Sequence, residues 1–230
     1  MKHLMLAVVT YDGQIEPPTR ACLRAAKQSA EERGWKTTNL HWAGDGLIAH
    51  ARNGAAAAFL RSECTDLMFV DSDVAWDGDA LCRLAEYPVD VVAGAYRYRR
   101  EPEQYSVRLL PGIPEVLNPH GLLEAECVAA GMLRISRTCL ERMVDYYADR
   151  VYSDASGMAW CLFDCGLLDG FYYGEDTYFC RRWRDIGGSI WVDPSITTHH
   201  LGCAEGRAHS GRQTYSGCLG EWLSRKEVAA

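Results

Sequence analysis

Apolar and polar positions along the chain fall into two repeating patterns, one typical of β-strands and one typical of α-helices. Apolar runs of strand length predict strands at residues 4–11, 37–42, 66–70, 89–96 and 189–194. Between and after them, apolar residues recur at helical spacing and predict helices at residues 17–34, 46–62, 77–87, 136–150 and 174–187. Strands that alternate with helices predict an α/β fold, with a mainly parallel sheet covered by helices on both faces.

This rhythm changes after residue 96. Residues 97–130 contain prolines, turns and short alternating runs, which predict an inserted antiparallel lobe. Residues 152–174 are rich in Gly, Asp and aromatic side chains and predict a loop, and the end of the chain predicts loops and a short helix. The length of 230 residues suits one domain, so we expect a single domain over residues 1–230.

The composition narrows the class of protein. Hydrophobic residues make up 48% and charged residues 24%, which is typical of a soluble globular chain. The net charge of −7 excludes a global basic field for nucleic acid, although RYRR (97–100) and RRWR (181–184) are local basic runs. No apolar run reaches the length of a membrane span, and the N-terminus resembles a first strand more than a signal peptide. We therefore expect a cytoplasmic protein with no membrane anchor.

Ten cysteines are a high number for this length. Several of them lie within helical patterns, where Cys acts as a small hydrophobic residue, so we expect mostly buried free thiols. Cys161, Cys165 and the HHLGC run (199–203) could bind zinc, but their spacing matches no common zinc module.

The strongest chemical signal follows the third expected strand. Its apolar residues end in Asp71-Ser72-Asp73, two carboxylates that repel each other unless a cation lies between them. Ligands bind at the carboxyl ends of strands in open α/β sheets, and hard divalent cations share carboxylate oxygens with phosphates. The pair therefore predicts a site that holds Mg²⁺ or Mn²⁺ against a diphosphate.

Other interpretations of this stretch have to be weighed. The aspartates could cap the next helix or stabilise a turn. A calcium EF-hand is excluded, because Trp76 and Cys82 occupy the positions that require Gly and Glu. The pattern also resembles haloacid-dehalogenase-like phosphatases, in which the first Asp is a nucleophile, but that family carries the motif on its first strand.

Further motifs occur in a definite order on both sides of the carboxylate pair. ARN (51–53) precedes the strand, and AAGMLRISR (129–137) is a glycine-led apolar segment. YYGEDTYFCRRWRDIGGSIWVDPSITTHHLG (172–202) supplies an acid pair, a helix, Gly, a strand and histidine. From Leu4 to about Gly202 the chain resembles glycosyltransferases of the GT-A class, which use nucleotide sugars. It resembles in particular the family-2-like enzymes of the small stand-alone bacterial and phage type. The resemblance implies a Rossmann-like fold with a nucleotide-binding half (1–96) and an acceptor-binding half (97–230).

The resemblance also implies roles for individual residues. Contacts to the nucleotide sugar are implied for Thr10, Tyr11, Asp12, Arg52, Asp71 and Ser72. The resemblance implies that Asp71, Asp73 and His200 bind Mn²⁺ or Mg²⁺. His199 is the alternative to His200 as a metal ligand. Asp176 is the implied general base, with Glu175 beside it, and acceptor contacts are implied for Tyr96, Arg97 and Trp76.

Each role has a structural alternative. Glu175 and Asp176 could cap the helix that they open, Arg52 could be a surface charge, and Trp76 and Tyr96 could be core aromatics.

The function that follows is a metal-dependent hexosyltransferase that moves a sugar from a UDP-sugar to an acceptor hydroxyl. A base at Asp176 implies inversion of the anomeric centre, whereas a retaining enzyme would not need it. The acceptor could be hydroxymethylpyrimidine in phage-type DNA, in the cytoplasm of the host, or a saccharide or protein hydroxyl. A haloacid-dehalogenase-like phosphatase and a non-catalytic nucleotide-sugar-binding module are the alternatives.

Overall fold

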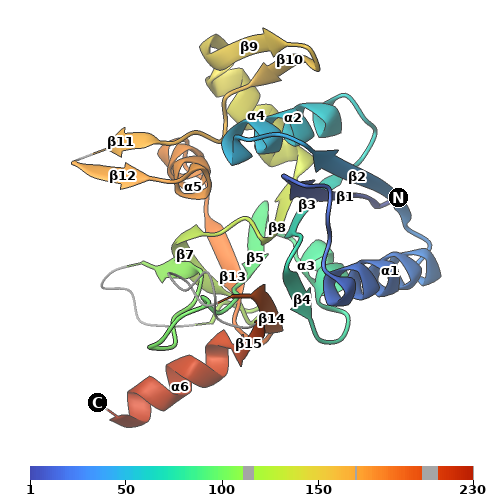
Figure 1. Cartoon of the computed structure of the whole chain (residues 1–230). Helices are drawn as coiled ribbons and strands as arrows, with labels where there is room; N and C mark the ends of the chain where they lie inside the picture. The colour runs from blue at the N-terminus through green and yellow to red at the C-terminus, as the bar shows by residue number, and fades with distance from the viewer. Residues whose placement is uncertain (111–116, 169, 204–211, 230) are drawn as a thin grey trace.

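An eight-stranded sheet forms the centre of the protein (Figure 1). The computed structural model describes residues 1–110, 117–168, 170–203 and 212–229. In spatial order the strands are β2 (Lys36–Ala43), β1 (His3–Thr10), β3 (Asp66–Asp71), β8 (Met132–Ser136), β5 (Val91–Gly94), β13 (Ile190–Asp193), β7 (Leu123–Val128) and β6 (Val107–Leu109). All of them except β8 and β7 run in the same direction, so the sheet is mainly parallel, as predicted.

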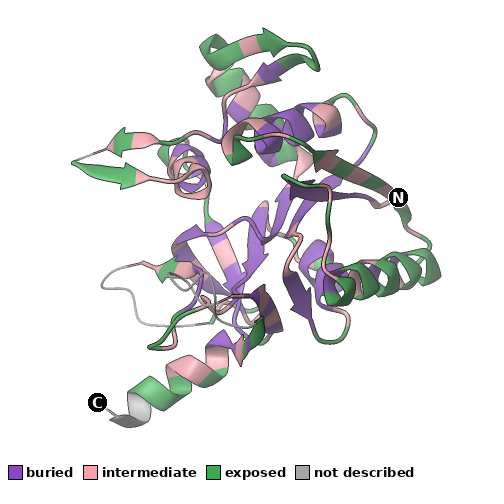
Figure 2. Cartoon of the chain, viewed as in Figure 1, coloured by how far each residue is buried: buried purple, intermediate pink, exposed green. Residues whose placement is uncertain are grey.

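Helices cover both faces of this sheet. The side chains of β1 alternate between the faces: Leu4 and Leu6 belong to one apolar cluster, and Met5 and Ala7 to the other. The first cluster includes residues of α1 (Pro17–Glu32) and α3 (Ala80–Glu86), and the second includes residues of α2 (Ile48–Leu60), α4 (Arg137–Tyr146) and α5 (Glu175–Asp185). Figure 2 shows the buried strands between these partly exposed helices. The predicted α/β fold is confirmed.

The alanine-rich face of α2 packs closely on the sheet. Ala51, Ala55 and Ala56 are buried there, and a Cβ on Gly54 would lie 2.3 Å from the indole of Trp42. Small side chains thus bring α2 near the strand ends. Arg52 follows Ala51 on this helix, and the close approach places its guanidinium beside Asp71 at the end of β3.

The second half of the chain differs in detail from the expectation. Residues 97–130 do supply antiparallel strands, but β6 and β7 extend the edge of the main sheet; residues 111–116 of this segment lie outside the described part of the chain. The glycine-led segment forms β8, which runs antiparallel between β3 and β5.

The expected loop at 152–174 contains two hairpins. They are formed by β9 (Val151–Asp154) with β10 (Gly157–Trp160), and by β11 (Gly166–Leu168) with β12 (Phe171–Tyr173). A short 3₁₀ helix, η1 (Ala148–Arg150), precedes the first hairpin.

A smaller sheet lies beside the end of β3. Its order is β15 (Gln213–Cys218), β14 (Thr197–Gly202) and β4 (Val74–Trp76), and α6 (Leu219–Ala229) follows it. Residues 204–211 of the expected C-terminal loops lie outside the described part of the chain. All ten cysteines are free, as expected. Among the described residues, no helix has the length and apolar character needed to cross a membrane.

Candidate functional site

The polar ends of neighbouring strands meet at one edge of the main sheet. Asp71 ends β3 and lies opposite Val9 in the parallel register, one residue before Thr10 at the end of β1. The chain beyond β5 brings Tyr96 to the same region, where its hydroxyl donates to Asp71 Oδ2 at 3.4 Å. The sheet therefore gathers residues from separate parts of the sequence where α/β folds usually bind ligands.

Arg52 joins two carboxylates beneath this edge. Its side chain is only 5% exposed; Nη2 donates to Asp71 Oδ1 at 3.0 Å, and Nη1 lies 3.1 Å from Glu175 Oε1. Gly131 leaves room for the arrangement, since a Cβ there would lie 2.5 Å from Asp71 Oδ2 and 2.6 Å from Tyr96. Arg52 is thus a buried brace for Asp71 and not a surface charge, and it also holds Glu175 at the start of α5.

Burial dominates the titration of these groups. Burial raises the pKa of Asp71 above its ordinary value, and the Arg52 charge only partly opposes this effect. Burial likewise raises the pKa of Glu175, where Arg52 opposes the shift and Asp176 adds to it. Burial and the Asp71 charge raise the pKa of Tyr96, so its phenol stays a hydrogen-bond donor.

Asp73 has a different set of partners. Its Oδ2 accepts a hydrogen bond from Arg99 Nη1 at 2.8 Å and lies 3.6 Å from His200 Nε2. The backbone holds the two strands together here, because Leu201 N donates to the Asp73 carbonyl at 2.8 Å. Burial would raise the pKa of Asp73, but the nearby His200 imidazole and then the Arg99 charge lower it below its ordinary value. Asp73 is therefore the more readily ionised carboxylate of the pair.

The two histidines of β14 point in different directions, as successive strand residues do. His200 is 7% exposed; its Nδ1 donates to the Arg97 carbonyl at 2.9 Å, and its Nε2 faces Asp73. His199 lies 2.9 Å from Asp77 Oδ1 and 2.8 Å from Ser216 Oγ instead. The geometry favours His200 over His199 as a ligand at this site.

Asp73, His200 and Asp71 together could supply part of the coordination shell of a divalent cation. Asp73 and His200 offer an oxygen and a nitrogen, and Asp71 is the next carboxylate along. No group of three acidic, His or Cys side chains that could hold a metal alone occurs among the described residues. Hard cations such as Mg²⁺ complete their shell with water and substrate phosphates, so two protein ligands are compatible with such an ion.

Four other candidate residues lie near the end of β1 or in the carboxylate turn. Thr10 is buried, and its hydroxyl lies 2.8 Å from His41 Nε2. Tyr11 is 77% exposed, and Asp12 is exposed with its carboxylate accepting from Gln14 N at 2.9 Å. The Ser72 carbonyl accepts from Glu16 N at 2.9 Å. Tyr11 and Asp12 are thus both open to solvent, and Tyr11 is the one of the two with an aromatic ring.

The three candidate acceptor residues are placed differently. Trp76 is 5% exposed inside the α1–α3 cluster, so its ring offers no face to an acceptor, and the structural alternative holds for it. Tyr96 is also buried and stacks edge-on against His200, with ring centroids 4.9 Å apart. Arg97 pairs with Glu101, and its guanidinium lies over the ring of Tyr215 at 5.7 Å. Trp76 therefore belongs to the core and Tyr96 to the carboxylate site, whereas the Arg97 side chain is engaged by Glu101 and Tyr215.

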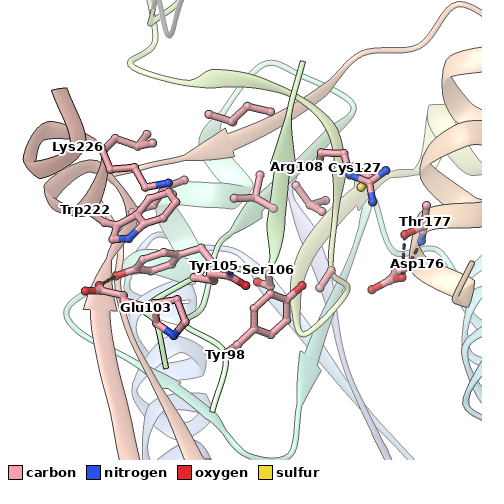
Figure 3. A pocket seen from close by; sticks show the side chains of 18 of the residues that line it. Tyr98, Glu103, Tyr105, Ser106, Arg108, Cys127, Asp176, Thr177, Trp222 and Lys226 are labelled. Carbon is pink, nitrogen blue, oxygen red and sulfur yellow. Dashed lines mark hydrogen bonds between the residues drawn. The ribbon is translucent and has the colours of Figure 1, made fainter. Parts of the chain in front are cut away.

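A groove of about 940 Å³ begins at Asp176 (Figure 3). Asp176 and Thr177 line one end at the start of α5, and Trp222 and Lys226 of α6 line the other. Between them Figure 3 shows Tyr98, Tyr105, Ser106 and Arg108. The Asp176 carboxylate accepts from Thr177 N at 2.7 Å, whereas Glu175 lies 3.1 Å from Arg52. The two members of the acid pair thus have different surroundings: Glu175 contacts Arg52, which also holds Asp71, and Asp176 lines the groove.

Sequence reasoning missed two parts of this site. Arg99 was visible only as one residue of the RYRR run, although Gly202, in the HHLG motif, makes room for it. The contribution of α6 to the groove had no local signal, because Trp222 and Lys226 meet residues 98–109 only through the folded chain.

Comparison with known proteins shows a fold and no family. No family model matches the chain, and no curated protein matches it. The chain is similar to A197 from STIV, with a TM-score of 0.52 at 20% identity over 87% of this chain and 85% of that one, which indicates a shared fold. It has weaker likenesses to GalNAc-T7, crystallised with UDP, GalNAc and Mn²⁺ (TM-score 0.49, 11% identity, 88% of this chain and 44% of that one), and to residues 1–349 of S. aureus TarS (0.40, 16%, 84% and 58%). These two weaker likenesses identify no function for this chain.

Proposed function

We propose that this protein is a metal-dependent glycosyltransferase that moves a hexose from a nucleoside-diphosphate sugar, with UDP as the first candidate, to an acceptor hydroxyl. The observation that carries the proposal is the Asp71–Asp73 pair at the carboxyl end of β3, with Arg52, Arg99 and His200 around it. An arrangement of two carboxylates, two guanidiniums and an imidazole at this edge suits a diphosphate and its cation.

The donor would lie over the ends of β1 and β3. Asp73 and His200 would hold Mn²⁺ or Mg²⁺, and the bound ion would supply positive charge to the departing diphosphate. Arg52 keeps Asp71 in place, and Tyr11, with its exposed ring, is available to the base of the nucleotide. The buried Tyr96 and Arg52 make this side of the site rigid before the donor arrives.

The acceptor would enter along the groove that ends at Asp176. The acceptor oxygen attacks the anomeric carbon, its proton passes to the Asp176 carboxylate, and the bond to the diphosphate breaks so that the nucleoside diphosphate leaves. Asp176 suits this role better than Glu175, because Glu175 is engaged by Arg52 at 3.1 Å whereas Asp176 faces the groove. Attack from the side opposite the leaving group implies inversion.

Nucleotide binding tests the donor half of this proposal. UDP, GDP, ADP and TDP are titrated separately into the protein with Mn²⁺, with Mg²⁺ and with chelator, and the melting temperature is followed. One diphosphate should raise the melting temperature only when the cation is present, because binding to the folded state alone stabilises it. Equal shifts in chelator would refute a metal-mediated donor site.

The acceptor is tested by transfer to a panel that contains hydroxymethylpyrimidine DNA, oligosaccharides and a protein. Product mass identifies the acceptor class directly. If nucleoside diphosphate is released but no acceptor of the panel is glycosylated, the true acceptor is not in the panel. If nucleotide binds but no nucleoside diphosphate is released from any nucleotide sugar, the protein is a non-catalytic binding module.

A further inference from the structure

Arg99 holds the oxygen of Asp73 that a divalent cation would use. Its Nη1 lies 2.8 Å from Asp73 Oδ2 and 3.0 Å from the Leu201 carbonyl. The same Oδ2 faces His200 Nε2 at 3.6 Å, so the guanidinium is bound where the oxygen and nitrogen ligands converge. The Arg99 guanidinium therefore occupies the place beside Asp73 Oδ2 where a divalent cation would bind.

The surrounding chain is shaped for this guanidinium. Gly202 has a φ of +136°, and a Cβ there would lie 2.5 Å from Arg99 Nη1, so a side chain at this position would compete with Arg99 for space. Arg99 Nε is buried and has no hydrogen-bond partner among the residues that the structure describes. A guanidinium with an unused buried donor gains from a ligand that brings further acceptors.

The segment that carries Arg99 is itself anchored. Tyr98 N donates to the Gln104 carbonyl at 2.9 Å, and Arg97 and Tyr105 form a β-bridge. A long side chain on an anchored backbone can change partners by rotation alone. The pair with Asp73 is only partly buried, with 30% and 26% of the two side chains exposed, so exchanging it is cheap.

We propose that Arg99 is a gate between cation and donor: it neutralises Asp73 while the donor is absent, and it turns to the donor diphosphate when cation and donor bind together. The gate rests on the proposed function. A cation alone must displace Arg99 and leave it without a carboxylate, whereas a diphosphate offers oxygens in the geometry that a guanidinium fork prefers. Cation and nucleotide should therefore strengthen each other's binding, by the same factor in both directions.

Mn²⁺ binding measured by electron paramagnetic resonance, without and with saturating UDP, tests the gate. In the wild type, UDP should tighten Mn²⁺ binding. In Arg99→Gln, Mn²⁺ alone should bind about two- to fivefold more tightly, because a partly exposed ion pair that competed for Asp73 is gone, and the tightening by UDP should shrink. Arg100→Gln is the matched control: Arg100 is exposed and donates to Gln104 Oε1 at 2.8 Å, and its loss should change neither value.

Arg99→Lys keeps the test decisive if the glutamine variant folds poorly. An ammonium keeps the charge but loses the planar fork, so Mn²⁺ alone should bind with an affinity between those of wild type and Arg99→Gln. Unchanged or weaker binding of Mn²⁺ alone in both variants, with a lowered melting temperature, would overturn the gate and make Arg99 a structural tie. If none of UDP, GDP, ADP and TDP tightens Mn²⁺ binding in the wild type, the proposed function is overturned and the gate with it.

Discussion

Glu175 and Asp176 are neighbours at the start of α5, and their substitution by amides should have opposite consequences. Glu175 lies 3.1 Å from the buried guanidinium of Arg52 and has 13% of its side chain exposed. Glu175→Gln removes one of two carboxylates facing a buried guanidinium and should cost about 1–3 kcal/mol of stability, which lowers the melting temperature of a chain of this size by roughly 2–4 °C per kcal/mol. Its transfer rate should stay within about tenfold of wild type at a temperature where the variant is folded.

Asp176→Asn should behave in the reverse way. The asparagine oxygen can still accept from Thr177 N, now bonded at 2.7 Å, so stability should stay within about 0.5 kcal/mol. An amide cannot take the acceptor proton, so the transfer rate should fall by about 10²–10⁴. Thermal melts, nucleotide-sugar titration and transfer to the best acceptor of the panel, all on the same preparations, separate the two effects. A rate for Asp176→Asn close to that of wild type would refute the assignment of the base and return attention to Glu175 or to a retaining mechanism.

Three further outcomes follow from the structure. Arg52→Met should destabilise the protein by about 1–3 kcal/mol, since it leaves two partly buried carboxylates without their cation. Urea denaturation measures this loss, and a value well below about 1 kcal/mol would contradict the bracing role. Hydrogen bonds to Asp45 and then Asp154 raise the pKa of His50 in the folded protein. The stability that these contacts add is complete below the unfolded-state pKa of about 6.5, and it is lost as the pH rises through the raised folded-state pKa. His50→Gln should therefore flatten the fall in urea midpoint from pH 6 to 8, and an unchanged profile would count against this contact. If the acceptor is hydroxymethylpyrimidine DNA, Arg100→Gln should weaken DNA binding and reduce its salt slope by about one, whereas an unchanged slope would exclude a phosphate contact.

The sequence predicted the parts of the fold that depend on local pattern. Apolar runs alternating with helical segments gave the strands β1, β2, β3, β5 and β13, and the abrupt end of β3 in Asp71 marked the site edge. Local pattern could not show that β8 enters the sheet antiparallel, since a short apolar run has no direction of its own. Short, exposed strands such as those of the 152–174 hairpins also carry little apolar signal.

The site was predictable in its residue types and less so in its pairings. The carboxylate pair and the histidine were visible because they follow strands, but the partner of Asp73 is 26 positions away and was one of three arginines in a run. The resemblance implied an acceptor contact for Trp76, whereas its ring is buried in the cluster that contains residues of α1 and α3. Long-range packing decides which polar residues near a strand end face the site and which aromatic residues face the core.

Release of nucleoside diphosphate from a panel of nucleotide sugars, in wild type and Asp73→Asn, tests the central claim most directly. Asp73 ends a solvent-facing turn and has 26% of its side chain exposed, so its substitution by an isosteric amide should leave the fold intact. We expect the wild type to release nucleoside diphosphate from one donor with Mn²⁺, and expect this release to stop both in excess chelator and in Asp73→Asn. Full release in chelator by both proteins, or release of inorganic phosphate from phosphorylated metabolites in place of nucleoside diphosphate, would contradict a metal-dependent glycosyltransferase.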